Sequence, residues 1–170
     1  MPGDKYLRNN AGTLAEVEAR QSSAGSADAG RIPALDPGGR FDVSMMPTGI
    51  GADTVQITAS EALGAGDLVN VWNSGGSPRV RKADASATGK DAHGFVTAAV
   101  ALGAAATVFF EGNNQQVAGL SAGVQFLSAT TAGAATSVAP SGAGQVVQRV
   151  GVATSATSLN FEMSQPVVLA

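Results

Sequence analysis

The chain has 170 residues and a formal net charge of −3 at pH 7, with a hydrophobic fraction of 44% but only 5% aromatic and 14% charged residues. This length allows one core-bearing domain and a tail, and the acidic balance provides no basic field to neutralise the phosphates of a nucleic acid. The chain contains no cysteine, which excludes disulfides and thiolate chemistry, so we expect extra stability to come from oligomerisation.

No signal peptide is predicted at the start of the chain, because Asp4, Lys5 and Arg8 are not followed by an apolar run. The longest uncharged stretch, from Gly94 to Phe110, is shorter than the roughly 20 residues that cross a bilayer. We therefore expect a protein that is made in a cytoplasm and has no membrane partner.

Residues 1 to 53 differ from the rest, because turn signals recur in them with little apolar periodicity. Only Thr13 to Arg20 has helical features: Thr13 and Glu16 have capping-box spacing, and Leu14 and Val17 lie one turn apart. Two helical turns are not stable alone in water. Such a segment is either disordered or ordered by a neighbour, and its isolated apolar residues favour the neighbour. We predict an extended N-terminal arm with a short helix.

From residue 54 onward, short runs rich in Val, Ile, Thr and Phe are bounded by Gly, Asn, Asp or Pro, which is typical of an all-β domain. The expected strands are Val55 to Ala59, Asp67 to Trp72, Arg79 to Lys82, Gly94 to Val100, Ala106 to Glu111, Gln115 to Val117, Val124 to Ala129, Ala135 to Val138, Val146 to Ala153, Ser158 to Phe161 and Val167 to Leu169. Their spacing leaves no room for crossover helices. We predict a mainly β fold, with an antiparallel β-sandwich or jelly-roll-like body over residues 54 to 170.

Two segments contain residue types that can carry out chemistry. Gly119 to Gly123 matches the nucleophile-elbow pattern around Ser121, but the base of such an elbow follows the serine, whereas the single histidine, His93, precedes it. A hairpin turn is therefore predicted there. His93 could serve as a pH-sensitive contact or a metal ligand, but with no second histidine a structural role is favoured. We expect no enzyme activity, no metal and no cofactor.

Trp72 and the adjacent pair Phe109 and Phe110 are among the largest side chains of the predicted body. Trp72 either packs in the core or anchors a subunit interface. Adjacent strand residues point to opposite faces, so Phe109 and Phe110 cannot both enter a single one-sided core. One of them is expected to cover a second layer or a partner subunit.

Three segments carry a resemblance to phage proteins. Gly30 to Pro47 resembles a linker of phage head-decoration, head-fibre and tail-fibre proteins, where the pattern is approximately G-K-I-x-x-L-D-x-x-G-[KR]-h-D-x-S-h-h-P, with h apolar. Val146 to Phe161, with the closing Pro166 to Leu169, is similar to the end of small phage capsid-stabilising proteins, and Ala92 to Val96 adds to the likeness.

This resemblance implies a β-sandwich or jelly-roll body on the outer capsid lattice of the virion, with an arm that reaches across capsomers. A cement protein of this kind adds buried area between capsid subunits. The major capsid protein is then the main partner, and the protein is made in the bacterial host. The expected partner contacts are the apolar residues of the arm: Leu14, Val17, Ile32, Leu35, Phe41, Met45 and Met46.

The main alternative is a tail-fibre, head-fibre or spike subunit whose body binds a host receptor. Composition favours the cement protein, because glycan-binding tips usually present exposed aromatic residues, and this chain has one Trp and one Tyr. A hydrolase or lyase acting on polysaccharide would need converging carboxylates. A homotrimer is the favoured assembly, and a homodimer on a two-fold axis is the alternative.

Overall fold

The computed structural model describes residues 4–46 and 51–170, in which it contains β-strands and two short 3-10 helices but no α-helix. The prediction of a mainly β protein is confirmed. The chain divides into two compact units, residues 1–51 and residues 52–170. No helix in the described residues is long and apolar enough to cross a membrane.

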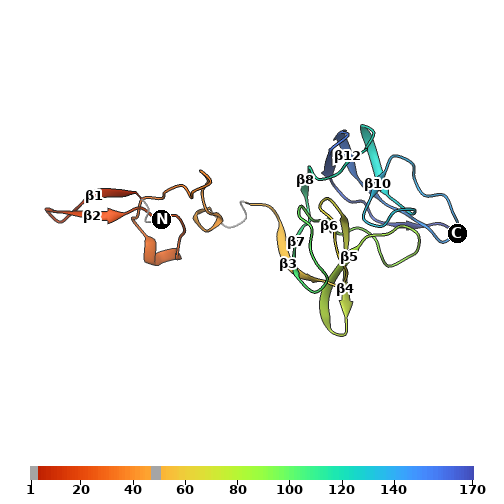
Figure 1. Ribbon diagram of the computed structural model, residues 1–170, viewed down its shortest axis with the longest axis horizontal. Helices are drawn as coiled ribbons and strands as arrows, with labels where there is room; N and C mark the ends of the chain where they lie inside the picture. The colour runs from red at the N-terminus through yellow and green to blue at the C-terminus, as the bar shows by residue number, and fades with distance from the viewer. Residues whose placement is uncertain (1–3, 47–50) are drawn as a thin grey trace. The chain divides into compact units, whose positions relative to one another are not determined.

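The N-terminal unit begins with a hairpin of two antiparallel strands, β1 (Lys5–Asn10) and β2 (Thr13–Glu18) (Figure 1). Ala11 and Gly12 form its turn with φ of 50° and 92°, as in the two-residue turns that match strand twist. The short helix predicted over residues 13–20 is therefore wrong. The alternating residues of β2 pair along their whole length with β1, whereas two isolated helical turns would be only marginally stable.

After the hairpin, the chain turns back on itself through two 3-10 helices, η1 (Gly25–Asp28) and η2 (Val43–Met45). The N–H of Arg20 donates to the carbonyl of Ile32 at 2.9 Å, and the N–H of Ala34 donates to the carbonyl of Arg20 at 2.7 Å. The Arg20 side chain also forms an ion pair with Asp28 at 3.0 Å. The segment predicted as an extended arm thus contains a small folded unit.

The body begins with a closed barrel of five strands in the order β3-β5-β4-β6-β7. The strands are β3 (Thr54–Ala59), β4 (Leu68–Ser74), β5 (Ser77–Lys82), β6 (Gly94–Phe95) and β7 (Ala105–Phe109). All neighbouring pairs are antiparallel except β3 and β5, which are parallel. One apolar cluster of these strands and their connections is buried: Ile57, Ala59, Leu63, Val69, Val80, Val96, Ala106 and Val108.

A five-stranded antiparallel sheet follows, in the order β10-β9-β12-β13-β8. Its strands are β8 (Gly112–Asn114), β9 (Gly123–Leu127), β10 (Ala135–Thr136), β12 (Arg149–Ser155) and β13 (Ser158–Phe161). A separate antiparallel pair joins β11 (Val146–Val147) to β14 (Val167–Val168) near the C-terminus.

A second apolar cluster joins the barrel to this sheet. Leu68 and Phe95 from the barrel pack in the same cluster as Leu127, Val150, Leu159 and Phe161 from the sheet. The ring of Phe95 lies 5.3 Å from that of Phe109 and 5.6 Å from that of Phe161, measured between centroids. Gly94 permits this approach, because a Cβ there would lie 2.5 Å from the carbonyl oxygen of Phe109. Two β layers packed on a shared core make the body sandwich-like.

Candidate partner-binding surface

The N-terminal unit has almost no apolar core. Ala19 is the only apolar residue of residues 4–46 that is buried, and seven large apolar side chains are between 43% and 72% exposed. These are Leu7, Leu14, Ile32, Leu35, Phe41, Val43 and Met46. A unit of this size gains little stability from burial within itself. Exposed apolar side chains at this density make this surface a candidate for partner binding.

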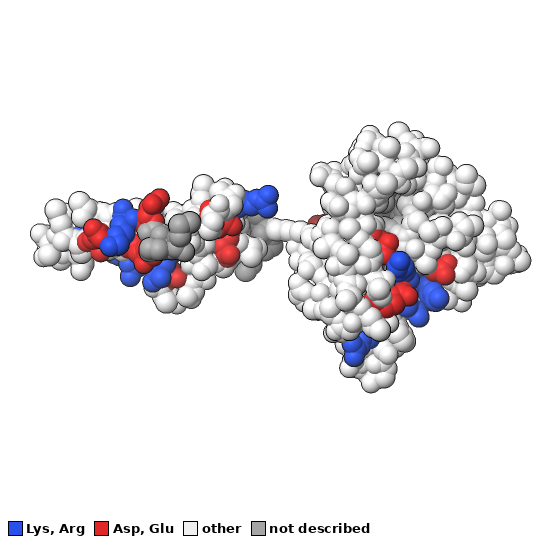
Figure 2. Space-filling model, viewed as in Figure 1, with Lys and Arg blue, Asp and Glu red and all other residues white. Residues whose placement is uncertain are grey.

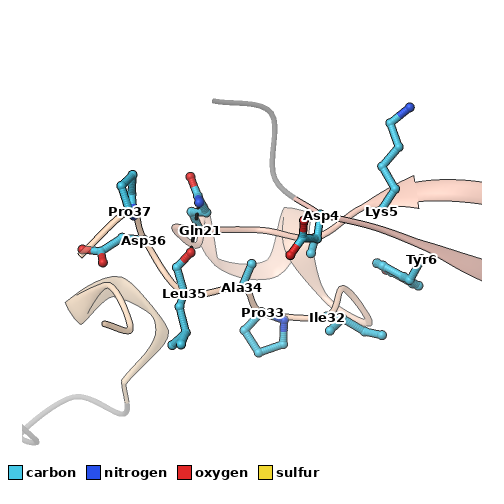
Figure 3. Close-up of a pocket in the computed structure, with 11 residues that line it drawn as sticks. Asp4, Lys5, Tyr6, Gln21, Ile32, Pro33, Ala34, Leu35, Asp36 and Pro37 are labelled. Atoms are coloured by element: carbon cyan, nitrogen blue, oxygen red, sulfur yellow. Dashed lines mark hydrogen bonds between the residues drawn. The ribbon is translucent and has the colours of Figure 1, made fainter. Parts of the chain in front are cut away.

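A groove of about 470 Å³ lies between β1 and the returning segment 32–37. Figure 3 shows Ile32, Pro33, Ala34 and Leu35 following one another along one segment, with Asp4, Lys5 and Tyr6 at the start of β1. The Gln21 amide donates to the carbonyl of Leu35 at 3.0 Å and fixes this segment. Apolar residues therefore line one side of the groove, and the charged groups of Asp4, Lys5 and Asp36 lie at its margins.

The turn that follows the groove is held by Asp36. Its Oδ1 accepts hydrogen bonds from the N–H groups of Gly38, at 2.8 Å, and Arg40, at 2.9 Å. The N–H of Asp36 donates to the carbonyl of Arg40 at 2.8 Å, which closes the turn. Such side-chain to backbone bonds fix a loop that has no regular structure. Leu35 and Phe41 are consequently presented on either side of a fixed turn.

Asp42 fixes the next turn in the same way. Its Oδ1 accepts from the Ser44 hydroxyl at 2.6 Å and from the Ser44 N–H at 2.9 Å, and these two bonds lower the pKa of the Asp42 carboxyl. The Ser44 hydroxyl oxygen also accepts from the N–H of Ser23 at 2.8 Å. Both aspartates of the phage-linker pattern thus bind backbone. Pro47, which ends that pattern, lies outside the described residues.

The structure separates the predicted contact residues into groups. Ile32 and Leu35 line the groove together. Phe41 and Met46 are exposed in the turns that follow, and Met45 is half-buried. Leu14 is exposed on one face of the hairpin and Val17 is half-buried on the other. Successive residues of a strand point to opposite faces, so two residues that are three positions apart lie on different faces.

Two exposed apolar residues of this surface, Leu7 and Val43, were not predicted from the sequence. Leu7 lies between Tyr6 and Arg8, and Val43 lies between Asp42 and Ser44. Leu7 shares a strand face with the polar residues Lys5 and Asn9, so no apolar alternation marks it in the sequence. Val43 stands at an unspecified position of the linker pattern, between Asp42 and Ser44, and no signal in the sequence identifies it.

Trp72 lies half-buried on the outer wall of the barrel in β4. Its indole N–H donates to the Ser60 hydroxyl oxygen at 3.2 Å, and the guanidinium carbon of Arg81 lies 4.7 Å from the centre of the ring. Arg81 is held in turn by the side-chain oxygen of Asn70 at 3.0 Å. Trp72 is therefore not a core residue, and one face of its ring interacts with a fixed cation.

Phe109 and Phe110 pack against different layers. Phe109 contacts the cluster between the barrel and the sheet, and Phe110 contacts the cluster of barrel residues. Phe110 also lines an open groove of about 500 Å³ together with Met163. The two adjacent phenylalanines thus pack against different apolar clusters of the same chain, because successive side chains of a strand point to opposite faces.

His93 uses both ring nitrogens in structural contacts. Nδ1 accepts from the N–H of Val71 at 3.0 Å, so the proton lies on Nε2, which donates to Asp91 at 2.9 Å. Ser121 lies in the loop between β8 and β9, and its carbonyl accepts from the Gln125 amide at 2.6 Å. These two strands do not pair with each other, so the hairpin turn predicted at Gly119 to Gly123 is wrong. Among residues 4–46 and 51–170, no three His, Asp or Glu side chains are grouped to hold a metal ion.

No protein-family model, no curated protein and no solved structure matches the chain. The exposed apolar surface of the N-terminal unit is therefore the main structural feature from which function can be inferred.

Proposed function

We propose that this chain is a non-enzymatic virion protein of a bacteriophage, which decorates and stabilises the exterior of the capsid as a cement protein. Its N-terminal unit binds the major capsid protein across neighbouring subunits, and its body stands on the lattice. The protein is made in the cytoplasm of the bacterial host and assembles there as a homo-oligomer, a trimer or a dimer.

One observation supports this proposal above all: the N-terminal unit exposes seven large apolar side chains and buries only one small one among its described residues. Completing the burial of a half-exposed Ile or Leu contributes about 1 kcal/mol. With several such side chains, each copy of the chain contributes several times this free energy to binding. Repeated at symmetry-related positions of a shell, they oppose the separation of capsid subunits.

The resemblance of residues 30 to 47 to a phage linker supports the same assignment. The chain uses two features of this linker pattern. Asp36 and Asp42 fix the backbone, and the apolar residues next to them, Leu35 and Phe41, stay exposed. A linker that served only as a spacer would need neither fixed turns nor exposed Leu35 and Phe41.

The second candidate is a tail-fibre, head-fibre or spike subunit that attaches through the same unit and binds a host receptor with its body. Trp72 favours this candidate, because a half-exposed indole beside Arg81 is suited to stacking against a ligand. The two candidates differ in copy number and in the position of the chain on the particle.

Cryo-electron microscopy of purified particles distinguishes them. The cement protein predicts many symmetric copies on the shell, with residues 4–46 against the capsid protein. A few copies at a vertex or on the tail would favour the fibre. The chain's absence from particles would refute both.

A binding assay tests the contact surface directly. The full chain is mixed with capsids that lack it, and bound protein is measured after sedimentation. Leu35→Asp places a charge in the groove, and we expect it to lose most of its binding. Val138→Asp is the matched control, because Val138 is a 73% exposed residue of the body. Equal binding by both variants would contradict the proposal.

A further inference from the structure

The hairpin of the N-terminal unit has two open edges. Neither β1 nor β2 pairs with a third strand in residues 4–46 or 51–170. An isolated two-stranded hairpin is only marginally stable in water, and exposed strand edges readily pair with further strands. Leu7 and Leu14 lie on the same face of this hairpin and are 71% and 69% exposed.

The two edges differ in charge. β1 carries the basic residues Lys5 and Arg8 and no acidic residue, whereas β2 carries the acidic residues Glu16 and Glu18 and no basic residue. Within one hairpin, Lys5 of β1 and Glu16 of β2 already form an ion pair. Figure 2 shows basic and acidic side chains crowded on the N-terminal unit, whereas much of the visible face of the body is uncharged.

The backbone pattern indicates which groups point away from the hairpin. The N–H of Ala19 donates to the carbonyl of Asp4 at 2.8 Å, next to the paired Lys5 and Glu18. Hydrogen-bonded and non-hydrogen-bonded pairs alternate in an antiparallel ladder. The backbone groups of Leu7 in β1 and of Leu14 and Glu16 in β2 therefore point outward, at the positions that carry the exposed leucines.

We propose that this hairpin joins copies of the chain, with the β1 edge of one copy pairing with the β2 edge of the next. This pairing brings basic residues of one copy against acidic residues of the other and Leu7 beside Leu14. Pairing β1 with β1, or β2 with β2, would instead place like charges together, which is unfavourable in a sheet. The charge pattern thus selects a head-to-tail contact over a two-fold one.

A head-to-tail contact uses two different edges of each copy, so a finite assembly must close as a ring. The returning segment 32–34 already bonds to Arg20, just beyond the end of β2. An incoming strand therefore has only residues 13 to 18 available to it. The paired segment of the neighbouring copy is therefore no longer than about one strand, which favours a single register. Leu7 and Leu14, at the centre of the inferred contact, do not line the groove at Ile32 and Leu35, whereas Lys5 and Tyr6 of β1 do.

Disulfide trapping tests this contact, because the chain has no native cysteine. Leu7→Cys and Leu14→Cys are made as separate full-length variants and oxidised alone and as an equal mixture. We expect a disulfide-linked dimer in the mixture and little in either sample alone. Leu14→Cys linking to itself would show a two-fold contact and overturn the proposal. No linking in any sample would also overturn it.

Val138→Cys mixed with Leu7→Cys is the matched control for random collision, and we expect it not to link above background. Linking at the same level as the test mixture would overturn the assigned contact.

Charge reversal provides a second test that does not need a fixed register. Lys5→Glu with Arg8→Glu makes both strands acidic, and Glu16→Lys with Glu18→Lys makes both basic. We expect either double variant to be monomeric by light scattering and the quadruple variant, which restores opposite charges, to assemble. A monomeric wild type, or assembly by both double variants, would overturn the proposal. No capsid is present, so the result is independent of capsid binding.

Discussion

The side-chain amide of Gln148 forms two hydrogen bonds with the backbone of Ala92. Its Oε1 accepts from the Ala92 N–H at 2.7 Å, and its Nε2 donates to the Ala92 carbonyl at 2.9 Å. Both residues are almost completely buried. Gln148 lies between β11 and β12, and Ala92 lies in the loop before β6, so this contact fixes a barrel connection against the sheet layer.

Replacing Gln148 with Met keeps the size of the side chain but removes both of these hydrogen bonds and a third, from Nε2 to the Ser164 carbonyl at 3.3 Å. Each buried backbone group that loses its partner costs about 1–3 kcal/mol. We expect Gln148→Met to lower the free energy of unfolding of the body by about 2–5 kcal/mol, measured by urea denaturation. Gln115→Met is the control, because Gln115 is exposed, and it should change little. A loss below 1 kcal/mol in Gln148→Met would show that water or a rearrangement satisfies Ala92.

Phe95 connects the two layers of the body through its contacts with Phe109 and Phe161. Truncation of a fully buried phenylalanine leaves a cavity and costs about 3–5 kcal/mol. We expect Phe95→Ala to destabilise the body by this amount in a thermal or denaturant melt. Leu102→Ala, at a 70% exposed position, should be nearly neutral. Similar melting of the two variants would mean that the barrel and the sheet do not share this core.

Two substitutions in the turn at Ala11 and Gly12 should have opposite effects on the stability of the hairpin. Both residues have positive φ, which costs about 1 kcal/mol for a residue with a Cβ and nothing for glycine. Ala11→Gly should therefore stabilise the hairpin, and Gly12→Ala should destabilise it. Hydrogen exchange of residues 5 to 18 measures both effects. The body, as a separate unit, serves as an internal reference whose exchange should not change.

The turn around Asp42 should respond to acid. The pKa of the Asp42 carboxyl is lowered by its hydrogen bonds from Ser44, so the folded turn favours the charged carboxylate. This contribution is present at neutral pH and is lost as the pH falls through the lowered pKa. An NMR titration should show a lower pKa for Asp42 in the wild type than in Ser44→Ala. An equal pKa in the two proteins would exclude this hydrogen bond as its cause.

The class of the body was predictable because its strands are short and bounded by turn residues. Ser158 to Phe161 was predicted as a strand and is β13. The predicted strand from Gly94 to Val100 is shorter in the structure, where β6 ends at Phe95. The parallel pairing of β3 with β5, which completes the barrel, joins residues that are distant in sequence, and local patterns carry no information about it.

The helix over residues 13–20 was predicted wrongly for the same reason. Capping-box spacing and the Leu14 to Val17 interval are local signals, and they do not detect the partner strand at Lys5–Asn10. The exposed contact residues were easier to find. Ile32, Leu35 and Phe41 stand out as apolar residues in a polar segment, and this isolation agrees with their exposure of about one half.

The turns at Asp36 and Asp42 also bear on how this surface can evolve. The backbone there is held by the two carboxylates and by Ser44, and the apolar side chains of Leu35, Phe41 and Val43 take no part in those bonds. Mutations at these apolar positions can therefore accumulate without refolding the loop. A lineage that meets an altered partner could adapt its attachment by exchanging a few side chains on a conserved backbone template.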